Sequence, residues 1–160
     1  MDASASFDDR FLEGFGPGMA VQTLRRSCDL LPAGGGVYAV LIHEDRCPGF
    51  LSKSVGGHFK GKDPSVPVEI LKRKWVDGTR VVYVGQGSRL RARIRRLVAF
   101  AYGKPVSHWG GRYLWQLADR GKLSIRCLET PGEIPRGIES RMLAGFRSAH
   151  GRLPFANLRG

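Results

Sequence analysis

The sequence VVYVGQGSRLRARIRRL, residues 81–97, joins a short apolar run to a segment with five arginines in eight residues. The apolar run, at residues 80–85, predicts a buried strand. Gly85 and Gly87 would let the backbone approach a ligand closely, and Ser88 is a candidate cap for a helix of about 14 residues. Four apolar side chains would form the buried stripe of this helix: Leu90, Ile94, Leu97 and Ala101.

The arginines of this helix fall into two sets when they are placed at about 100° per residue. Arg89, Arg93 and Arg96 form a stripe beside the apolar face. We expect this stripe to hold phosphate groups, because one guanidinium can donate hydrogen bonds to two phosphate oxygens. Arg91 and Arg95 point elsewhere, and we expect them on a solvated helix face.

The charge of the chain indicates a polyanionic partner. Its 160 residues contain 26 Lys and Arg against 14 Asp and Glu, a net charge of +12. The first 30 residues have five acidic and three basic residues, so the excess lies in the remainder, with 23 basic and nine acidic residues. Nucleic acid is the favoured partner, because each phosphate that a basic side chain neutralises releases counterions. A basic protein without such a partner is the alternative.

Several other classes of protein are not expected. The sequence has no apolar run long enough to span a membrane, and its acidic N-terminus lacks the apolar segment of a secretory signal. Cys28, Cys47 and Cys127 are odd in number and far apart, which fits neither a disulfide framework nor a zinc site. We therefore expect a cytoplasmic, reduced protein without a membrane partner.

The remaining pattern predicts an α+β domain. Strands are expected at residues 37–42, 80–85 and 123–129, and helices at residues 20–30, 110–119 and 136–150. Residues 43–79 form a polar, basic insertion with a short helix near residues 67–74. Part of this insertion combines positive charge with an aromatic ring that can stack on a base, and these candidate nucleic-acid contacts are Lys72, Arg73, Lys74 and Trp75.

One carboxylate falls inside the apolar stripe of the last predicted helix. Glu139 shares that stripe, whose apolar members are Ile138, Met142, Phe146 and Ala149. A carboxylate in such a position is costly unless it is paired, hydrogen-bonded or bound to a metal. Two interpretations follow: a buried structural salt bridge, or a metal ligand or general acid/base.

Two tripeptides lie in the first two predicted strands, Gly36-Val37-Tyr38 and Tyr83-Val84-Gly85. Leu90 and Arg93 follow Gly85 by five and eight residues, Glu139 lies in the last helix, and residues 154–157 read PFAN. In this order the five elements resemble the GIY-YIG nuclease superfamily, in which they are the two strand motifs, a helix leucine and catalytic arginine, a metal-binding glutamate and a closing segment with an asparagine. The resemblance covers residues 36–157.

The resemblance implies a three-stranded antiparallel sheet flanked by helices. Residues 34–160 would be the nuclease domain, with the insertion at residues 43–79 similar to those of restriction-type members, and residues 1–33 would be an N-terminal helical extension. It also implies hydrolysis of DNA phosphodiester bonds with one divalent metal ion, Mg²⁺ or Mn²⁺, held by Glu139. RNA is not excluded as a substrate.

The same resemblance gives roles to the other motif residues. Tyr38 would take a proton from the attacking water or orient it, and Tyr83 would hydrogen-bond the phosphate or the water. Arg93 would stabilise the negative charge that develops on the phosphoryl group. Asn157 would orient the glutamate or another group of the site.

The sequence departs from the family pattern in three places. The motif tyrosines are 45 residues apart, more than in compact members. Leu97 lies one turn after the arginine, where the family often has His or Tyr, and His108 in the following loop is a candidate replacement or a structural histidine. Gln86 stands where repair-type members have lysine. The alternatives are a catalytically inactive nucleic-acid-binding module of this fold and a basic interaction protein, which would explain only the charge.

Overall fold

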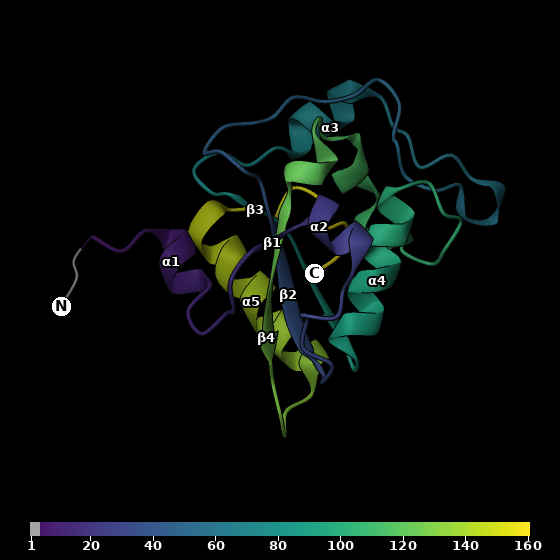
Figure 1. Ribbon diagram of the computed structural model, residues 1–160. Coiled ribbons are helices and arrows are strands. Elements are labelled where there is room, and N and C mark those ends of the chain that lie inside the picture. Colours follow the sequence, from purple (N-terminus) through teal and green to yellow (C-terminus); the bar gives the residue numbers. More distant parts are fainter. Residues whose placement is uncertain (1–3) are drawn as a thin grey trace.

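A four-stranded antiparallel sheet organises the structure, a computed structural model in which residues 4–160 are described (Figure 1). The strands lie in the order β1-β4-β2-β3. Their bounds are β1 (Met19–Ala20), β2 (Gly36–Leu41), β3 (Val81–Gly87) and β4 (Ser124–Glu129). The predicted α+β class is confirmed. The sheet has four strands rather than three, because β1 pairs with the outer edge of β4.

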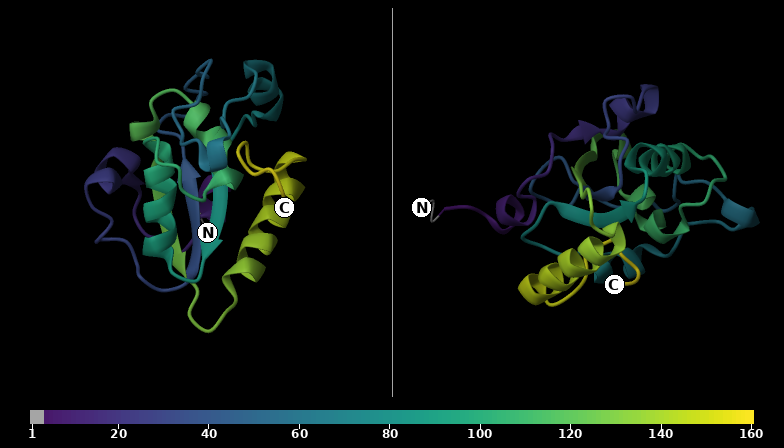
Figure 2. Two further views of the ribbon diagram at one scale, coloured as in Figure 1. Left: turned by 90° about the vertical axis from the view of Figure 1, so that its right-hand side faces the viewer. Right: turned by 90° about the horizontal axis from the view of Figure 1, so that it is seen from below.

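The helices cover both faces of this sheet. They are α1 (Phe7–Phe11), α2 (Val21–Arg26), α3 (Val68–Lys74), α4 (Leu90–Ala101) and α5 (Pro135–His150), with 3₁₀ helices η1 (Phe59–Gly61), η2 (Trp109–Gln116) and η3 (Arg120–Lys122). Figure 2 shows α4 and α5 on opposite sides of β3. No helix in residues 4–160 combines the length and apolar character needed to span a membrane.

Strand β2 is buried along its whole length, and its two faces belong to two separate apolar cores. Tyr38 and Val40 face the core that contains α2, α4 and η2. Val37, Ala39 and Leu41 face the second core, which contains α5 and the aromatic side chains of α1. The split follows from the alternation of side chains along a strand. It places Tyr38 beneath α4.

The start of α4 differs from the prediction. Ser88 is not its cap: the helix begins at Leu90, after Arg89, and no side chain caps it. The Leu90 and Arg91 N–H groups instead donate to the carbonyls of Gly34 and Pro32, at 2.9 and 3.1 Å. These carbonyls satisfy the free donors of the first turn. The segment before β2 therefore fixes the position of the helix that carries Arg93.

The other helix predictions agree with the structure in part. Residues 110–119 were expected to be a short helix, and residues 109–116 form a 3₁₀ helix with a kink at Gly111. Helix α2 ends at Arg26, earlier than the predicted residue 30. Helix α5 ends at Gly151, whose φ of 76° is left-handed, as expected for a glycine cap.

The N-terminal segment packs against the rest of the chain. The prediction for residues 1–33 includes residues 1–3, which lie outside the described residues. The carboxylate of Asp8 accepts hydrogen bonds from the Thr79 hydroxyl and the Arg80 N–H at 2.5 and 2.8 Å. Phe7 and Phe11 lie 5.7 and 5.9 Å from Phe146, between ring centroids. This segment therefore contributes to the second core.

Candidate active site

The centre of the candidate site is a contact between Tyr38 and His108. The Tyr38 hydroxyl oxygen lies 3.1 Å from His108 Nε2, and both side chains are buried. Tyr38 comes from the middle of β2, whereas His108 directly precedes η2. The structure therefore brings the loop histidine to the first motif tyrosine, across 70 residues of sequence.

Tyr83 and Arg93 complete this buried cluster. The ring of Tyr83 lies 6.1 Å from those of Tyr38 and His108, between centroids. Arg93, on α4, interacts electrostatically with both tyrosines and with the histidine. Its Nε is buried without a hydrogen-bond partner among the described residues. A buried donor of this kind is costly to leave unpaired, although the guanidinium also interacts with the hydroxyls of Tyr38 and Tyr83.

The protonation states of the cluster follow from its burial. Burial raises the pKa of Tyr38 well above its usual value and also raises the pKa of Tyr83, with Arg93 opposing both shifts. Burial, followed by the charge of Arg93, lowers the pKa of His108 from 6.5 to about 3. At neutral pH the two phenols and the imidazole are uncharged, and Arg93 is the charged member of the cluster.

Glu139 lies at the edge of this cluster on α5. Its carboxyl is half-buried, and burial raises its pKa, while Arg136 and Arg93 oppose that shift. The carboxylate makes no hydrogen bond or ion pair within residues 4–160, so the alternative of a structural salt bridge is not supported. Ala149 is exposed rather than part of the buried stripe, and Leu143 is buried beside Phe146 instead.

A cleft of about 590 Å³ opens beside the cluster. Three predicted site residues line it, Tyr83 of β3, Glu139 of α5 and Asn157 of the closing segment. Tyr38, Arg93 and His108 do not line it, and Tyr38 is fully buried. The second motif tyrosine, not the first, therefore faces the cleft. The remaining lining residues are Trp109, Gly110, Arg112, Leu158 and Arg159.

Two cationic residues of the cleft, Arg112 and Arg159, were not predicted from the sequence to be site residues. The Arg112 guanidinium lies 4.8 Å from the centroid of the Trp109 ring and donates to the Trp109 carbonyl at 3.1 Å. Arg159 follows the closing motif by two residues and is exposed. The signal for Arg112 was its position in the sequence four residues after His108, the residue that precedes η2. Together the two side chains make the cleft favourable for an anion.

Asn157 has a structural partner in β3. Its side-chain amide accepts from the Val84 N–H and donates to the Val84 carbonyl, both at 2.9 Å. The Ala156 N–H also donates to the Val82 carbonyl, at 2.8 Å. These bonds pair the closing segment with the free edge of β3. The hydrogen bonds of Asn157 thus fix the strand that presents Tyr83 and do not go to Glu139.

The other arginines of α4 have different environments. Arg89 and Arg96 are exposed, where they are free to contact phosphates. Arg95 is also exposed and lies 3.9 Å from Asp29. The prediction for Arg91 was wrong: its half-buried guanidinium donates to the Leu31 carbonyl at 2.7 and 3.0 Å and to the Asp29 carbonyl at 3.0 Å. Arg91 therefore anchors the segment before β2.

The candidate nucleic-acid contacts in the insertion also differ in exposure. Lys72 and Arg73 are exposed. The Lys74 ammonium is half-buried and donates to the Asn157 carbonyl at 3.2 Å. The half-buried ring of Trp75 packs 5.2 Å from Phe155 and 5.9 Å from Phe50, between centroids. Lys74 and Trp75 thus have structural partners, so only Lys72 and Arg73 keep the expected exposure.

A metal site in this cleft would depend on one carboxylate. Within residues 4–160, no group of three or more His, Cys, Asp or Glu side chains could hold a metal ion. Glu139 nevertheless fits a hard cation, because it is an unpaired carboxylate on the wall of an open cleft. Mg²⁺ is commonly bound through one or two carboxylates, with water and substrate phosphate oxygens as the other ligands.

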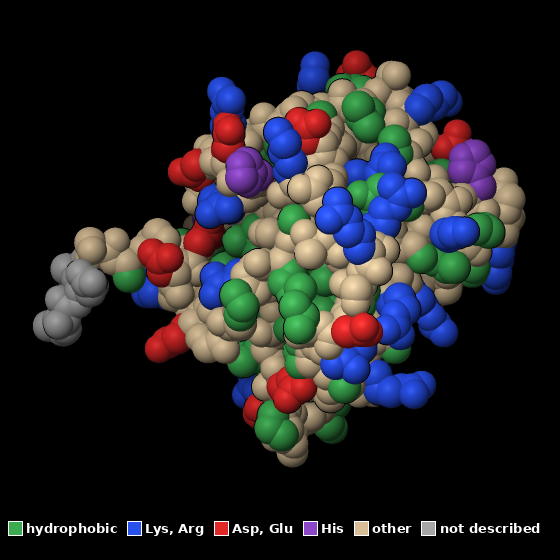
Figure 3. Space-filling view, viewed as in Figure 1, with side chains coloured by type: hydrophobic (Ala, Val, Ile, Leu, Met, Phe, Trp, Pro, Cys, Tyr) green, Lys and Arg blue, Asp and Glu red, His purple; other side chains and the backbone are tan. Residues whose placement is uncertain are grey.

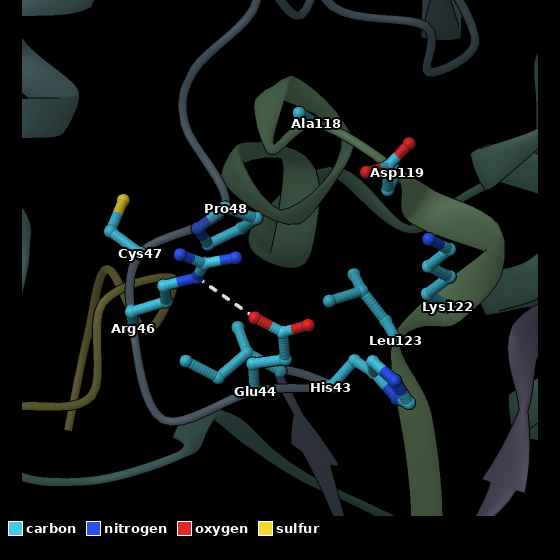
Figure 4. A pocket seen from close by; sticks show the side chains of 10 residues that line it. His43, Glu44, Arg46, Cys47, Pro48, Ala118, Asp119, Lys122 and Leu123 are labelled. Atoms are coloured by element: carbon cyan, nitrogen blue, oxygen red, sulfur yellow. Dashed lines mark hydrogen bonds and ion pairs between the residues drawn. The ribbon is translucent and has the colours of Figure 1, made fainter.

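A second pocket of about 340 Å³ lies elsewhere in the fold (Figure 4). It is lined in part by residues 42–48, and Arg46 and Glu44 form an exposed ion pair of 2.8 Å there. Asp119 and Lys122 lie across the pocket from that pair (Figure 4). None of the predicted catalytic residues lines this pocket.

Comparisons of the chain with family models, curated proteins and solved structures found no match. The resemblance to GIY-YIG nucleases therefore depends on the motif residues of this chain.

Proposed function

We propose that this protein is a metal-dependent endonuclease of the GIY-YIG type that hydrolyses DNA phosphodiester bonds. The observation that carries the proposal is the 3.1 Å contact of Tyr38 with His108, in one buried cluster with Tyr83 and Arg93. A structural core would not require an unpartnered guanidinium nitrogen beside two phenols and an imidazole. Glu139 on the wall of the adjoining cleft adds the carboxylate that the chemistry needs.

Arg93 would bind the phosphate and stabilise its transition state. The Arg93 Nε is buried without a hydrogen-bond partner among the described residues, so a phosphate would have to enter beyond the cleft lining to reach the guanidinium. A guanidinium in a site with little water interacts more strongly with an anion than one in bulk solvent. Arg112 and Arg159 would hold neighbouring phosphates at the rim of the cleft. Glu139 lines the same cleft as Arg112 and Arg159.

Tyr83, Tyr38 and His108 would form the route for a proton. Water attacks phosphorus and forms a new P–O bond as the bond to the sugar oxygen breaks; that oxygen then takes a proton from solvent. The water proton passes to the hydroxyl of Tyr83, which lines the cleft. At the same time Tyr83 passes its own proton to Tyr38, and Tyr38 passes its proton to His108 Nε2.

Substrate binding would make His108 a better base. Burial and the positive charge of Arg93 lower the pKa of His108 in the free protein. A phosphate bound to Arg93 offsets the second of these causes, so the pKa of His108 should rise when the substrate is in place. A divalent cation held by Glu139 would supply Lewis-acid polarisation of the phosphate.

Incubation with plasmid DNA, single-stranded DNA and RNA, each with Mg²⁺, Mn²⁺ or EDTA, tests the proposal. We expect plasmid nicking or cutting with either metal and none in EDTA. Undiminished cleavage in EDTA would refute the metal-dependent reading. Binding of DNA without cleavage under any of these conditions would support the inactive binding module instead.

A further inference from the structure

A cluster of basic side chains outside the cleft surrounds Tyr102, the C-cap residue of α4. The guanidinium carbons of Arg25 and Arg120 lie 3.9 and 4.2 Å from the centroid of the Tyr102 ring. Arg25 comes from α2 and Arg120 from η3, so three elements meet at this ring. We call this cluster, with Arg95 and Lys104, the Tyr102 patch.

The patch contains two small cavities that share Tyr102. One, of about 290 Å³, is lined by Arg25, Arg95, Lys104 and Tyr102, above an apolar floor. The other, of about 280 Å³, is lined by Arg120 and Tyr102 among other residues. The surface around the ring is therefore hollowed and mainly cationic, with Asp119 as one acidic residue in the lining of the second cavity. Figure 3 shows Lys and Arg side chains gathered over α2 and α4 on this face.

The two arginines at the ring are held without acidic partners. Neither Arg25 nor Arg120 forms an ion pair within residues 4–160, and Arg120 Nε is buried without a hydrogen-bond partner in the same part of the chain. Two like charges near one ring repel each other, whereas an anion between them would relieve the repulsion. The ring also limits the motion of both side chains, which reduces the entropy lost on binding.

We propose that the Tyr102 patch binds backbone phosphates of the nucleic acid whose scissile bond lies in the cleft. The proposal rests on the proposed function only for the identity of the substrate in the cleft. Helix α4 connects the two places, since it carries Arg93 near its start and Tyr102 caps its C-terminal end. Figure 2 shows α2 on one side of α4 and α5 on the other, so a strand leaving the cleft would pass over α4.

The distance along α4 suits this arrangement. Nine residues separate Arg93 from Tyr102, about 13.5 Å along a helix axis. Successive phosphates of one DNA strand advance by about 3.4 Å along the duplex, so the patch would hold phosphates about four nucleotides from the cut. Flat guanidiniums at fixed positions match separate phosphate oxygens better than the diffuse charge of a lipid surface. The patch should therefore add affinity and contribute little to the chemical step.

The test measures binding in EDTA, where the proposed chemistry is off, by fluorescence anisotropy with a labelled DNA duplex of about two helical turns. The Arg25→Gln/Arg120→Gln variant should bind at least tenfold more weakly at about 0.1 M salt, and the slope of log Kobs against log [salt] should be less steep by about 1.8. Arg25→Gln alone, at an exposed helix position, should account for about half of that change in slope.

The matched control is Arg46→Gln/Arg141→Gln, which removes the same charge from two exposed sites with carboxylate partners. Its salt slope should equal that of the wild-type protein. Equal slopes for the patch variants and the control would overturn the proposal. So would a patch effect seen only with phosphatidylserine vesicles and not with DNA. A protein that never cleaves, yet binds DNA through the patch, would refute the proposed function and leave this inference intact.

Discussion

Tyr38 and Gly85 lie directly opposite each other on β2 and β3, and the Tyr38 ring occupies the space that a side chain at residue 85 would fill. A Cβ atom placed on Gly85 would be 2.3 Å from Tyr38 Cζ and 2.4 Å from its hydroxyl oxygen. The last residue of the second motif thus makes room for the last residue of the first. This contact gives a steric reason why a chain with tyrosine at residue 38 has glycine at residue 85.

Gly85→Ala should therefore displace Tyr38 from His108. We expect the free energy of unfolding to fall by about 1–3 kcal/mol from overpacking, and single-turnover cleavage to slow by about a hundredfold from misplacement of the relay. Gly145→Ala in α5 is the control, because a Cβ there would meet nothing within 4 Å. That helical substitution should stabilise the protein by about 0.5–1 kcal/mol. Urea unfolding and cleavage with Mg²⁺ measure both effects, and unchanged cleavage by Gly85→Ala would contradict the proton route.

Glu139→Gln should separate catalysis from stability. Burial raises the pKa of the Glu139 carboxyl, so the folded protein binds that proton more readily than the unfolded chain does. The ionised carboxylate consequently destabilises the metal-free protein at neutral pH. The variant should be more stable than wild type at pH 7, and the difference should disappear as the pH falls and the wild-type carboxyl is protonated.

The same variant should lose cleavage and keep its affinity for DNA, because it loses the proposed metal ligand and no phosphate contact. Mg²⁺ should raise the melting temperature of wild type but not of Glu139→Gln. Glu133→Gln, which removes an exposed carboxylate 3.5 Å from Arg141, is the control and should cleave normally. Full cleavage by Glu139→Gln would exclude this carboxylate as the essential ligand.

His108 should make stability depend on pH in the acid range. Its pKa is lowered from 6.5 to about 3 by burial and by Arg93, so between these values the unfolded chain takes up a proton that the folded protein does not. The free energy of unfolding should therefore decrease as the pH falls through this range, with a contribution approaching about 1.4 kcal/mol per pH unit. His108→Gln should lack this contribution, whereas the exposed-site control His58→Gln should retain it. Parallel urea-unfolding profiles for wild type and His108→Gln would show that the imidazole is not held neutral.

The sequence predicted the three longer strands within one or two residues at most boundaries, because β2 and β3 contain apolar runs and β4 alternates polar with apolar residues. It could not predict β1, whose two residues have no period and are defined by pairing with Ile125 and Ser124. The prediction that Ser88 caps α4 was also wrong. The donors at the start of α4 are satisfied by Gly34 and Pro32, which only the tertiary structure brings there.

For the site as well, the sequence pattern predicted some features, and others depend on the tertiary structure. Helical spacing placed Glu139 inside one apolar stripe and Arg93 beside another, and both lie at the tyrosine cluster. Spacing could not show that Tyr83 rather than Tyr38 faces the cleft. The two side chains point to the same face of the sheet, and which of them is covered depends on tertiary packing against the other elements of that core. Arg112 was missed for a similar reason, because its position depends on η2, a 3₁₀ helix with a kink at Gly111.

Three arginines of α4 should respond differently to replacement by lysine, although every variant keeps the formal charge. Arg93→Lys loses the planar fork beside Tyr38 and Tyr83, and one lost transition-state donor typically lowers the rate by about 10²–10³. We expect a slower single-turnover rate of that order with DNA affinity nearly unchanged. Arg91→Lys should leave the rate nearly intact and lower the free energy of unfolding by about 1–2 kcal/mol, since it loses hydrogen bonds to the Leu31 and Asp29 carbonyls. Arg95→Lys, at an exposed position 3.9 Å from Asp29, should change neither quantity. Equal cleavage rates for the three variants would mean that α4 contributes only general positive charge, and Arg93 would lose its proposed catalytic role.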